Sequence, residues 1–327
     1  TYKLLALVVI VSLLAVIIFG GIKRIARFAE FVVPFMALGY ILMALVIVFM
    51  NLEALPGVIK MIFADAFSPM AGLGAAIGWG VKRGVYSNEA GQGTGPHAAA
   101  AAEVQHPAQQ GFVQAFSIYV DTLFVCSATA FMILITGMYN VQGTLEAGQF
   151  IIQNVTSTAE IGSPAFTQMA VSTVFGGFGQ IFVALAVFFF AFTTIVAYYY
   201  IAETNITYLS YITKAPSLLF LTKCFIILSV AYGVMSATGY IWGIGDIGVG
   251  LMAWINIIGI IVTYFVWKPT IKALRDYEEQ QKAGVKEYTF DPIKLGIKNA
   301  TYWEERLKTK NALEAQAQNA SSKKTAT

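Results

Sequence analysis

Two residue types on which enzymes and metal proteins depend are almost missing from this 327-residue sequence, which contains two cysteines and two histidines. Cys126 and Cys224 each lie inside an apolar run, without the spacing of a metal site, and are predicted to pack in the interior. No HExxH or Gly-x-Ser-x-Gly motif accompanies His97 and His106. The sequence therefore predicts no catalytic residues and argues against an enzyme.

Charged residues are also scarce. They make up 12% of the chain, whereas soluble globular domains contain about 25%. Hydrophobic residues make up 57% and the mean hydropathy is +0.67. The apolar residues form runs of about 20, the length with which a helix crosses a bilayer. The net charge of +3 comes from Lys and Arg beside these runs, so no nucleic-acid partner is expected. The composition predicts an all-α polytopic membrane protein in a lipid bilayer.

The apolar runs predict seven membrane spans, at residues 2–20, 28–50, 71–103, 110–137, 170–202, 217–237 and 247–267. The third and the fifth are too long for one simple crossing. Basic residues, which are typical of cytoplasmic loops, follow the first and the last span: Lys23, Arg24 and Arg27, and then Lys268, Lys272, Arg275 and Lys282. Since six crossings separate the two clusters, the charges and the span count agree. We expect a protein of the cell inner membrane with a cytoplasmic C-terminus.

Three segments lie outside the predicted spans. Residues 51–70 are predicted to be an extracellular loop with a short interfacial helix, because Pro56 precedes several apolar side chains. Residues 145–155 have a similar pattern. Residues 269–327 form a predicted cytoplasmic tail, and from Asn311 onward its composition of mainly small and polar residues, without periodicity, predicts partial disorder.

The most informative stretch is GVKRGVYSNEAGQGTGPHAAAAAE at residues 80–103, where glycines and polar residues interrupt an apolar span. Helix cannot comfortably continue through it, and a second half-helix is expected to begin near Pro96 and to continue through Ala102. Irregular backbone at membrane depth occurs where it is buried in protein or lines a water-filled cavity. The break therefore predicts a cavity whose freed N–H and carbonyl groups suit a carboxylate and a cation or ammonium group.

Other interpretations of this stretch stay open. The glycines could serve only close helix packing, as small residues do in membranes. Glu89 could be protonated, paired with Lys82 or Arg83, or purely structural. His97 could be a proton relay, although a structural hydrogen-bonding role fits a lone histidine better.

The sequence resembles the alanine or glycine:cation symporter family, the sodium:alanine symporters. The resemblance begins at SNEAGQGTGPHAAAAA (87–102), which is followed by His106-Pro107, Gln110-Gly111 and Asp121-Thr122. It continues at GGIKRIARFAEFVVPFMAL (20–38), FAFTTIVAYYYIAE (190–203) and WGIGDIGVGLMAWIN (242–256). It thus covers essentially all of residues 1–290.

This resemblance implies a LeuT-type fold of two inverted five-helix repeats, of which the chain would hold core helices four to ten. Residues 1–50 would be the last two core helices of the first repeat, and residues 71–268 the second repeat with its broken helix. Core helices one to three would belong to N-terminal helices of the same protein that are missing from this sequence. The implied activity is sodium-coupled import of a small neutral amino acid such as alanine or glycine, with sodium as the co-transported ion.

The resemblance also implies site residues. The substrate would be bound at the second broken helix, by Asn88, Glu89, Ala90, Gly91, Gln92, Gly93 and Thr94. Many relatives have a small or aliphatic residue followed by Gly-Ser where this chain has Gln92-Gly93-Thr94, which leaves the identity of the substrate open. The hydroxyls of Thr193 and Thr194, with the carbonyl near Phe190, would hold sodium, because hard cations prefer such oxygens. Alternatively, each threonine could hydrogen-bond to its own helix.

Three further acids match the family pattern. Asp246 is expected to cap the last span and Glu203 to be a gate or packing residue, while Asp121 is expected to pair with a partner inside the membrane. Two alternative functions are considered: a passive channel, or a LeuT-type carrier of a different small solute. A channel would favour a repeated pore motif, and the single asymmetric break fits an enclosed midplane site better.

Overall fold

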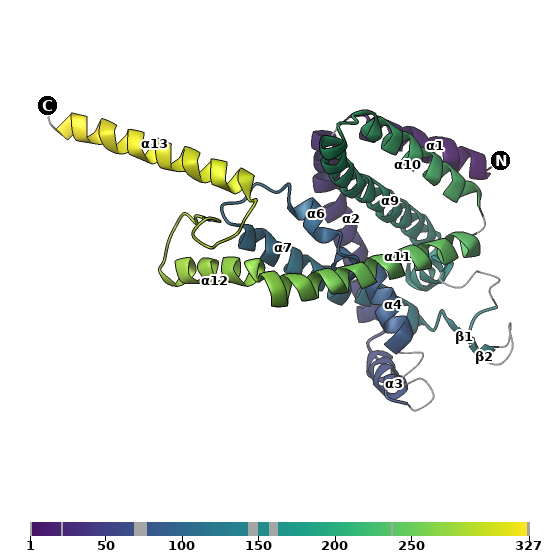
Figure 1. Cartoon of the computed structure of the whole chain (residues 1–327). Coiled ribbons are helices and arrows are strands. Elements are labelled where there is room, and N and C mark those ends of the chain that lie inside the picture. The colour runs from purple at the N-terminus through teal and green to yellow at the C-terminus, as the bar shows by residue number, and fades with distance from the viewer. Residues whose placement is uncertain are drawn as a thin grey trace. The chain divides into compact units, whose positions relative to one another are not determined.

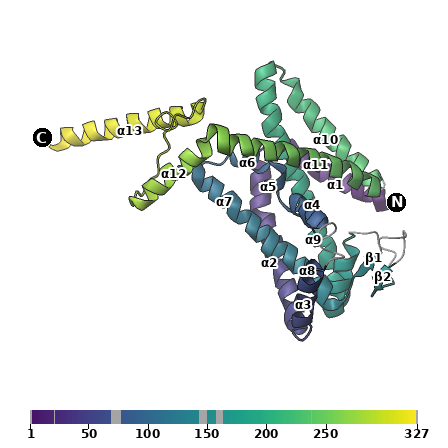
Figure 2. The same cartoon turned by 60° about the horizontal axis from the view of Figure 1, so that its bottom comes forward.

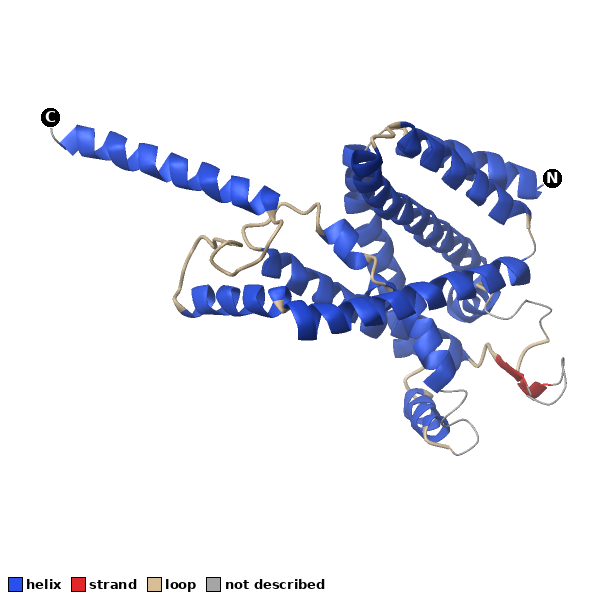
Figure 3. Ribbon diagram, in the orientation of Figure 1, coloured by secondary structure: helices blue, strands red, loops and turns tan. Residues whose placement is uncertain are grey.

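A computed structural model of the chain describes residues 2–20, 22–68, 77–142, 150–156, 163–236 and 238–325. Helices form nearly all of it, with one small hairpin among these residues (Figures 1 and 3). The elements are α1 (Tyr2–Ile18), α2 (Ile22–Met50), α3 (Leu55–Ala66), α4 (Ile77–Ser87), α5 (Glu89–Gln92), α6 (Gly95–Ala99), α7 (Pro107–Tyr119), the π-helical η2 (Val120–Cys126), α8 (Ser127–Thr136), β1 (Asn140–Gln142), β2 (Phe150–Gln153), α9 (Ala165–Thr213), α10 (Ser217–Met235), α11 (Thr238–Ile261), the π-helical η3 (Val262–Trp267), α12 (Pro269–Lys282) and α13 (Thr301–Thr325).

The chain divides into two compact units. The first consists of residues 1–98 and 118–249, and the second of residues 99–117 and 250–327. The interrupted helix and α9 belong to the first unit. The tail belongs to the second, together with the segment that leads into α7.

The first unit packs around α9. One cluster joins α9 to α2 and α8, and consists of Tyr40, Met43, Ala44, Ile47, Met132, Ala170, Val171, Val183 and Ala186. A second joins α9 to α1, with α10 beside it, and consists of Leu14, Ile17, Ile18, Phe192, Val196 and Tyr199. Figures 1 and 2 show α1 lying alongside α10. These clusters hold the part of α9 that carries the predicted sodium ligands.

Most of the apolar surface of these helices faces outward. α10 has no buried residue, although its sequence is apolar on all sides, which is typical of a helix in lipid. Five described helical segments are long and apolar enough to cross a membrane, and α1 is a shorter apolar helix. These helices confirm an all-α polytopic membrane protein. The count of seven spans remains a prediction, and the start of the third predicted span lies outside the described residues.

The fifth predicted span is longer than one crossing needs, and so is the helix that contains it. α9 has 49 residues, and its backbone leaves helical geometry at Gly176, with φ 57° and ψ −140°. Side chains other than glycine rarely adopt this conformation. Gly176 therefore divides α9 into a short first part and a long second part, which carries Thr193 and Thr194.

Two segments outside the spans differ from the prediction. Residues 150–153 form β2, which pairs antiparallel with β1, so the interfacial helix predicted for residues 145–155 is wrong there; residues 143–149 lie outside the described residues. The Asn140 side chain closes this hairpin by bonding to both backbone groups of Val155. Helix α13 includes Asn311 and continues to Thr325, where disorder was predicted. Its Ala, Glu, Gln and Lys residues have high helix propensity, which compensates for the missing periodicity. The helix predicted within residues 51–70 is confirmed as α3.

The second unit is built around a buried histidine. The His106 side chain is 0% exposed, and it packs against Tyr277 of α12 and Phe290, which in turn contacts Trp303 of α13. The Nδ1 atom accepts a hydrogen bond from the Ala108 N–H, so the proton of the neutral ring lies on Nε2. That nitrogen faces Asp276 Oδ2 at 3.4 Å.

His106 also begins α7. Its ring bonds to the N–H two residues on, Pro107 occupies the first helical position, and the Gln109 side chain accepts the backbone N–H of His106 at 3.0 Å. This is the reciprocal pattern of a capping box, with histidine in the usual place of serine or threonine. It gives the His106-Pro107 motif a structural role.

Candidate functional site

The interrupted helix is confirmed. α4 ends at Ser87, Asn88 has extended backbone, α5 lasts one turn, and Gly93 adopts the left-handed conformation with φ 75° and ψ 15°. Asn88 caps α5, because its Oδ1 accepts a hydrogen bond from the Ala90 N–H at 3.2 Å. α6 follows but stops at Ala99, where an i to i+3 turn from Ala102 ends it. The second half-helix is therefore shorter than predicted.

Gln92 joins three helices at the break. Its side chain is 5% exposed. Its Nε2 donates to the Val85 carbonyl of α4 at 3.0 Å, and its Oε1 accepts from the Tyr198 hydroxyl of α9 at 2.5 Å. Carbonyls in the last turn of a helix lack an intrahelical donor, so Gln92 satisfies one of them. Both ends of its amide are thus occupied by protein groups.

Thr94 has a different environment. Its side chain is 7% exposed, and its buried Oγ1 has no hydrogen-bond partner in the structure. Buried hydroxyls nearly always have a partner, and an exception calls for an explanation such as a bound ligand. Thr94 is therefore the residue of the break whose chemistry most directly suits a ligand.

Gly91 serves packing. A β-carbon at this position would lie 3.0 Å from Val85 Cα and 3.0 Å from Val85 Cγ2, so α4 and the turn of α5 approach too closely for a larger residue. The packing interpretation of the glycines therefore holds for Gly91, whereas Gly93 is explained by its positive φ.

Lys82 pairs with Asp246 rather than with Glu89. Its Nζ lies 2.6 Å from Asp246 Oδ2, and the Tyr86 hydroxyl donates to Asp246 Oδ1 at 2.7 Å. The Arg83 guanidinium lies over the Trp242 ring, 5.2 Å from its centroid. The pairing of Glu89 with Lys82 is thus not what the structure shows. Asp246 does not cap a helix either, because α11 begins at Thr238 and Asp246 lies in its interior.

Asp121 has a partner, as expected. It lies in η2 and accepts a short hydrogen bond from the Ser87 hydroxyl. The next residue, Thr122, accepts from Asn88 Nδ2 at 3.3 Å. The last residue of α4 and the N-cap residue of α5 are thus bound to two consecutive residues of η2.

The interpretation of His97 as a hydrogen-bonding residue agrees with its contact to the Asn205 side-chain amide of α9, 2.5 Å from Nδ1. Glu203, also on α9, faces the Tyr199 hydroxyl one turn earlier, and Glu203 Oε2 and the Tyr199 hydroxyl are both buried.

The two threonines of the predicted sodium site hydrogen-bond to their own helix. Thr193 Oγ1 donates to the carbonyls of Phe189 at 2.8 Å and Phe190 at 3.2 Å, and Thr194 Oγ1 donates to the Phe190 carbonyl at 2.8 Å. This is the alternative arrangement named above. The Phe190 carbonyl accepts both hydroxyls in addition to its helical N–H, so it has little remaining capacity to bind a cation.

The structure brings together residues that the sequence does not link. Tyr198 connects α9 to the break through Gln92 and lies one turn after Thr194. It stands within the family-matching stretch at 190–203, but no local pattern distinguishes it from Tyr199 and Tyr200. Within the described residues, no group of three His, Cys, Asp or Glu side chains could hold a metal ion.

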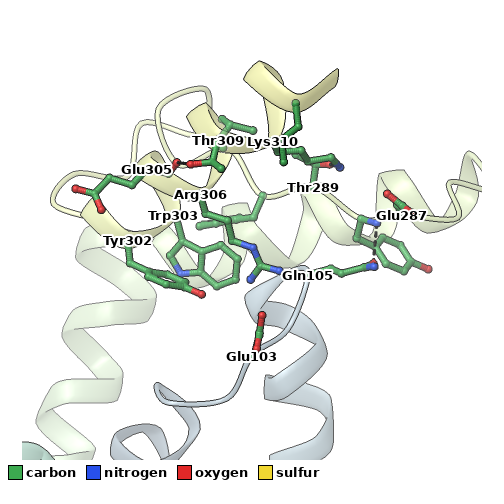
Figure 4. Close-up of a pocket in the computed structure, with 14 residues that line it drawn as sticks. Glu103, Gln105, Glu287, Thr289, Tyr302, Trp303, Glu305, Arg306, Thr309 and Lys310 are labelled. Atoms are coloured by element: carbon green, nitrogen blue, oxygen red, sulfur yellow. Dashed lines mark hydrogen bonds between the residues drawn. The ribbon is translucent and has the colours of Figure 1, made fainter. Parts of the chain in front are cut away.

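A separate cavity of about 600 Å³ lies within the second unit (Figure 4). It is lined by the segment around Gln105, by residues 287–290 and by the first turns of α13. Gln105 Oε1 accepts the Tyr288 N–H at 3.1 Å, and Arg306 donates to the Val104 carbonyl at 2.5 Å. The cavity thus lies where the tail contacts the segment that precedes α7, and the sequence did not predict it.

Comparison with known proteins places these features in a family. The model of the sodium:alanine symporter family matches residues 1–292. The putative sodium/proton-dependent alanine carrier protein YrbD of Bacillus subtilis is 56% identical over 299 residues, which cover 90% of this chain and 60% of the relative. The sodium/proton-dependent alanine carrier protein of Bacillus sp. PS3 is 50% identical over 306 residues, which cover 92% and 67%.

A more distant relative is the probable sodium/glutamine symporter GlnT of Bacillus subtilis, which is 34% identical over 318 residues, covering 96% of this chain and 59% of the relative. The chain spans 59% to 67% of the length of these three relatives. The match of the family model over most of the chain agrees with the interrupted helix and the apolar spans. The chain is therefore a multi-pass membrane protein that belongs to the sodium:alanine symporter family, a family of transport proteins rather than enzymes.

Proposed function

We propose that the protein to which this chain belongs is a sodium-coupled symporter that imports a small neutral amino acid, with alanine as its main substrate, by alternating access. Two relatives at 56% and 50% identity are named as alanine carriers. The observation within the chain that carries the proposal is the buried, unpartnered hydroxyl of Thr94 at the break. We further propose the LeuT-type arrangement of core helices four to ten, in the inner membrane, with residues 269–327 cytoplasmic.

In this proposal the amino acid binds between Ser87 and Pro96. Gly93 lets the backbone approach the ligand closely, and the Thr94 hydroxyl offers one donor and an acceptor to its carboxylate or ammonium group. Gln92 shapes the site by holding α4, α5 and α9 together rather than by direct contact, because its amide is already bonded at both ends. The other residues of the predicted set, Asn88, Glu89, Ala90 and Gly91, form the backbone around the ligand.

Sodium is proposed to bind at Thr193 and Thr194. Their hydroxyl oxygens keep lone pairs while their hydrogens point to helix carbonyls, and hydroxyl oxygens are suitable ligands for a hard cation. The remaining ligands would come from helices outside this chain. Phe190 contributes in this proposal by orienting both hydroxyls.

Uptake of radiolabelled alanine by the complete protein in proteoliposomes tests the function. Accumulation above the external concentration should require an inward sodium gradient and should stop when the gradient is collapsed. Equilibration that continues without a gradient would favour the channel alternative. Competition by unlabelled glycine and glutamine decides the substrate class, and stronger inhibition by glutamine than by alanine would contradict the proposed specificity.

Thr94→Val tests the site separately from the function. Valine has nearly the same shape but no hydroxyl, and since that hydroxyl has no partner in the structure, its loss should not lower the melting temperature. The affinity for alanine should fall about tenfold or more, as for a lost hydrogen bond to a charged group. Thr222→Val on α10, where the hydroxyl bonds only to its own helix at 2.8 Å, is the matched control. Unchanged alanine affinity in Thr94→Val would place the ligand elsewhere.

A further inference from the structure

The π-helical segment η2 interrupts a helix at the level of the break. It separates α7 from α8, and its sequence VDTLFVC contains neither glycine nor proline. In a π-helix each hydrogen bond spans five residues instead of four, which widens the segment and turns the following side chains to another face. Single π-helical turns are frequent at functional sites. The local sequence offers no other reason for the change of helix type.

The side chains of η2 that face the end of α4 are polar. Asp121 accepts from the Ser87 hydroxyl, Thr122 accepts from Asn88, and Cys126 Sγ lies 3.1 Å from Ser87 Oγ. All three contacts reach two consecutive residues. These are Ser87, the last residue of α4, and Asn88, the N-cap residue of α5.

Asn88 links η2 to the cap of α5. Its Nδ2 donates to Thr122, while its Oδ1 accepts from the Ala90 N–H and so caps α5. The geometry of the cap therefore depends on where η2 holds the amide. Asp121 fixes the preceding residue, Ser87, in the same way, because its Oδ2 accepts the Ser87 hydroxyl.

We infer that Asp121 is a positioning residue for substrate binding: it holds Ser87 so that the break keeps the backbone geometry that receives the amino acid, without touching the ligand. This inference rests on the proposed function. Ionised or polar groups inside a membrane need partners in any case, so a merely structural pair is the competing explanation. The two explanations differ in what the loss of the pair does to alanine affinity.

A double-mutant cycle in the complete transporter separates them. Ser87→Ala and Asp121→Ala should each raise the alanine concentration for half-maximal uptake about tenfold, while the uptake rate at saturating alanine is largely retained. The double variant should be no worse than either single variant, because one interaction is lost in all three. Asp121→Asn, which keeps an acceptor for the hydroxyl, should recover most of the affinity.

Ser117→Ala is the matched control. It lies on α7, and its hydroxyl bonds only to the Gln114 carbonyl of the same helix. Additive effects, or an unchanged alanine requirement in Ser87→Ala, would overturn the inference, and Ser87→Ala removes too little to prevent folding. Failure of the wild-type protein to bind alanine would instead refute the proposed function, so the two failures are distinguishable.

Discussion

Replacing Gln92 should destabilise the protein more than it alters the substrate site directly. Gln92→Ala removes the donor to the Val85 carbonyl and the acceptor for the Tyr198 hydroxyl. A polar group left buried without a partner costs about 1–3 kcal/mol. The Val85 carbonyl should show the full cost, whereas the Tyr198 side chain is 36% exposed and its hydroxyl can find another partner. We therefore expect a loss of about 2–4 kcal/mol.

Thermal unfolding of the purified complete transporter in detergent measures this loss. Tyr198→Phe removes one hydrogen bond and leaves the Gln92 Oε1 atom without a partner, so it should cost about 1–2 kcal/mol. In the combined variant Gln92→Ala/Tyr198→Phe the costs should not add, because the two side chains share one bond. Gln168→Ala is the matched control, since its amide donates to a carbonyl at an exposed position, 3.2 Å from Gln180 O.

A Gln92→Ala protein that melts like the wild type but binds alanine more weakly would refute this reasoning. That result would mean that the Gln92 amide is available to the substrate and that its bonds to Val85 and Tyr198 contribute nothing to stability. Additive losses in the double variant would refute the specific pairing of Gln92 with Tyr198.

Three further predictions concern other contacts. Changing Thr193 and Thr194 to Ala together should raise the sodium concentration for half-maximal uptake about tenfold or more, measured in proteoliposomes, without preventing membrane insertion. Lys82→Ala should lower the melting temperature, because it leaves the Asp246 carboxylate without its cation. Exchanging the two charges in Lys82→Asp with Asp246→Lys should restore much of the loss in the same melting assay. Burial lowers the pKa of His106 below the usual 6.5. The neutral ring therefore contributes its full stabilisation above that pH, and this stabilisation is lost on acidification because the unfolded chain takes up the proton first. The fall in melting temperature between pH 7.5 and 5.5 should be smaller in His106→Gln than in the wild-type protein.

The break could be predicted from sequence because its causes are local. Glycines, a proline and polar side chains within residues 80–103 oppose a continuous helix, and Gly93 and Asn88 act as their residue types suggest. The partners of the break could not be predicted. Tyr198 bonds to Gln92 from 106 residues away, and Asp121 bonds to Ser87 from 34 residues away. Asp246 bonds to Tyr86 and Lys82 of α4 from 160 and 164 residues away. Only the tertiary packing brings these residues together.

The two incorrect segments show where local pattern fails. Phe150, Ile151 and Ile152 are consecutive apolar residues, and such short runs fit a helix and a strand equally well; the pairing with β1 decides for the strand. In the tail, the missing apolar periodicity suggested disorder. The aromatic contact of Trp303 with Phe290 holds the start of α13, and a helix that has begun can extend through residues of high propensity.

The threonine pair on α9 has a consequence for how an ion would be received. A hydroxyl rotor that donates to a carbonyl is locked, and its oxygen becomes more electron-rich because linked hydrogen bonds polarise one another. The Thr193 hydroxyl is fixed by the Phe189 carbonyl and the Thr194 hydroxyl by the Phe190 carbonyl. An arriving ion would therefore meet oxygens that are already oriented, and these side chains would lose little conformational freedom when the ion binds. Threonines that are hydrogen-bonded to their own helix are therefore compatible with rapid exchange of a weakly bound cation, since neither side chain has to change its rotamer when the ion arrives or leaves.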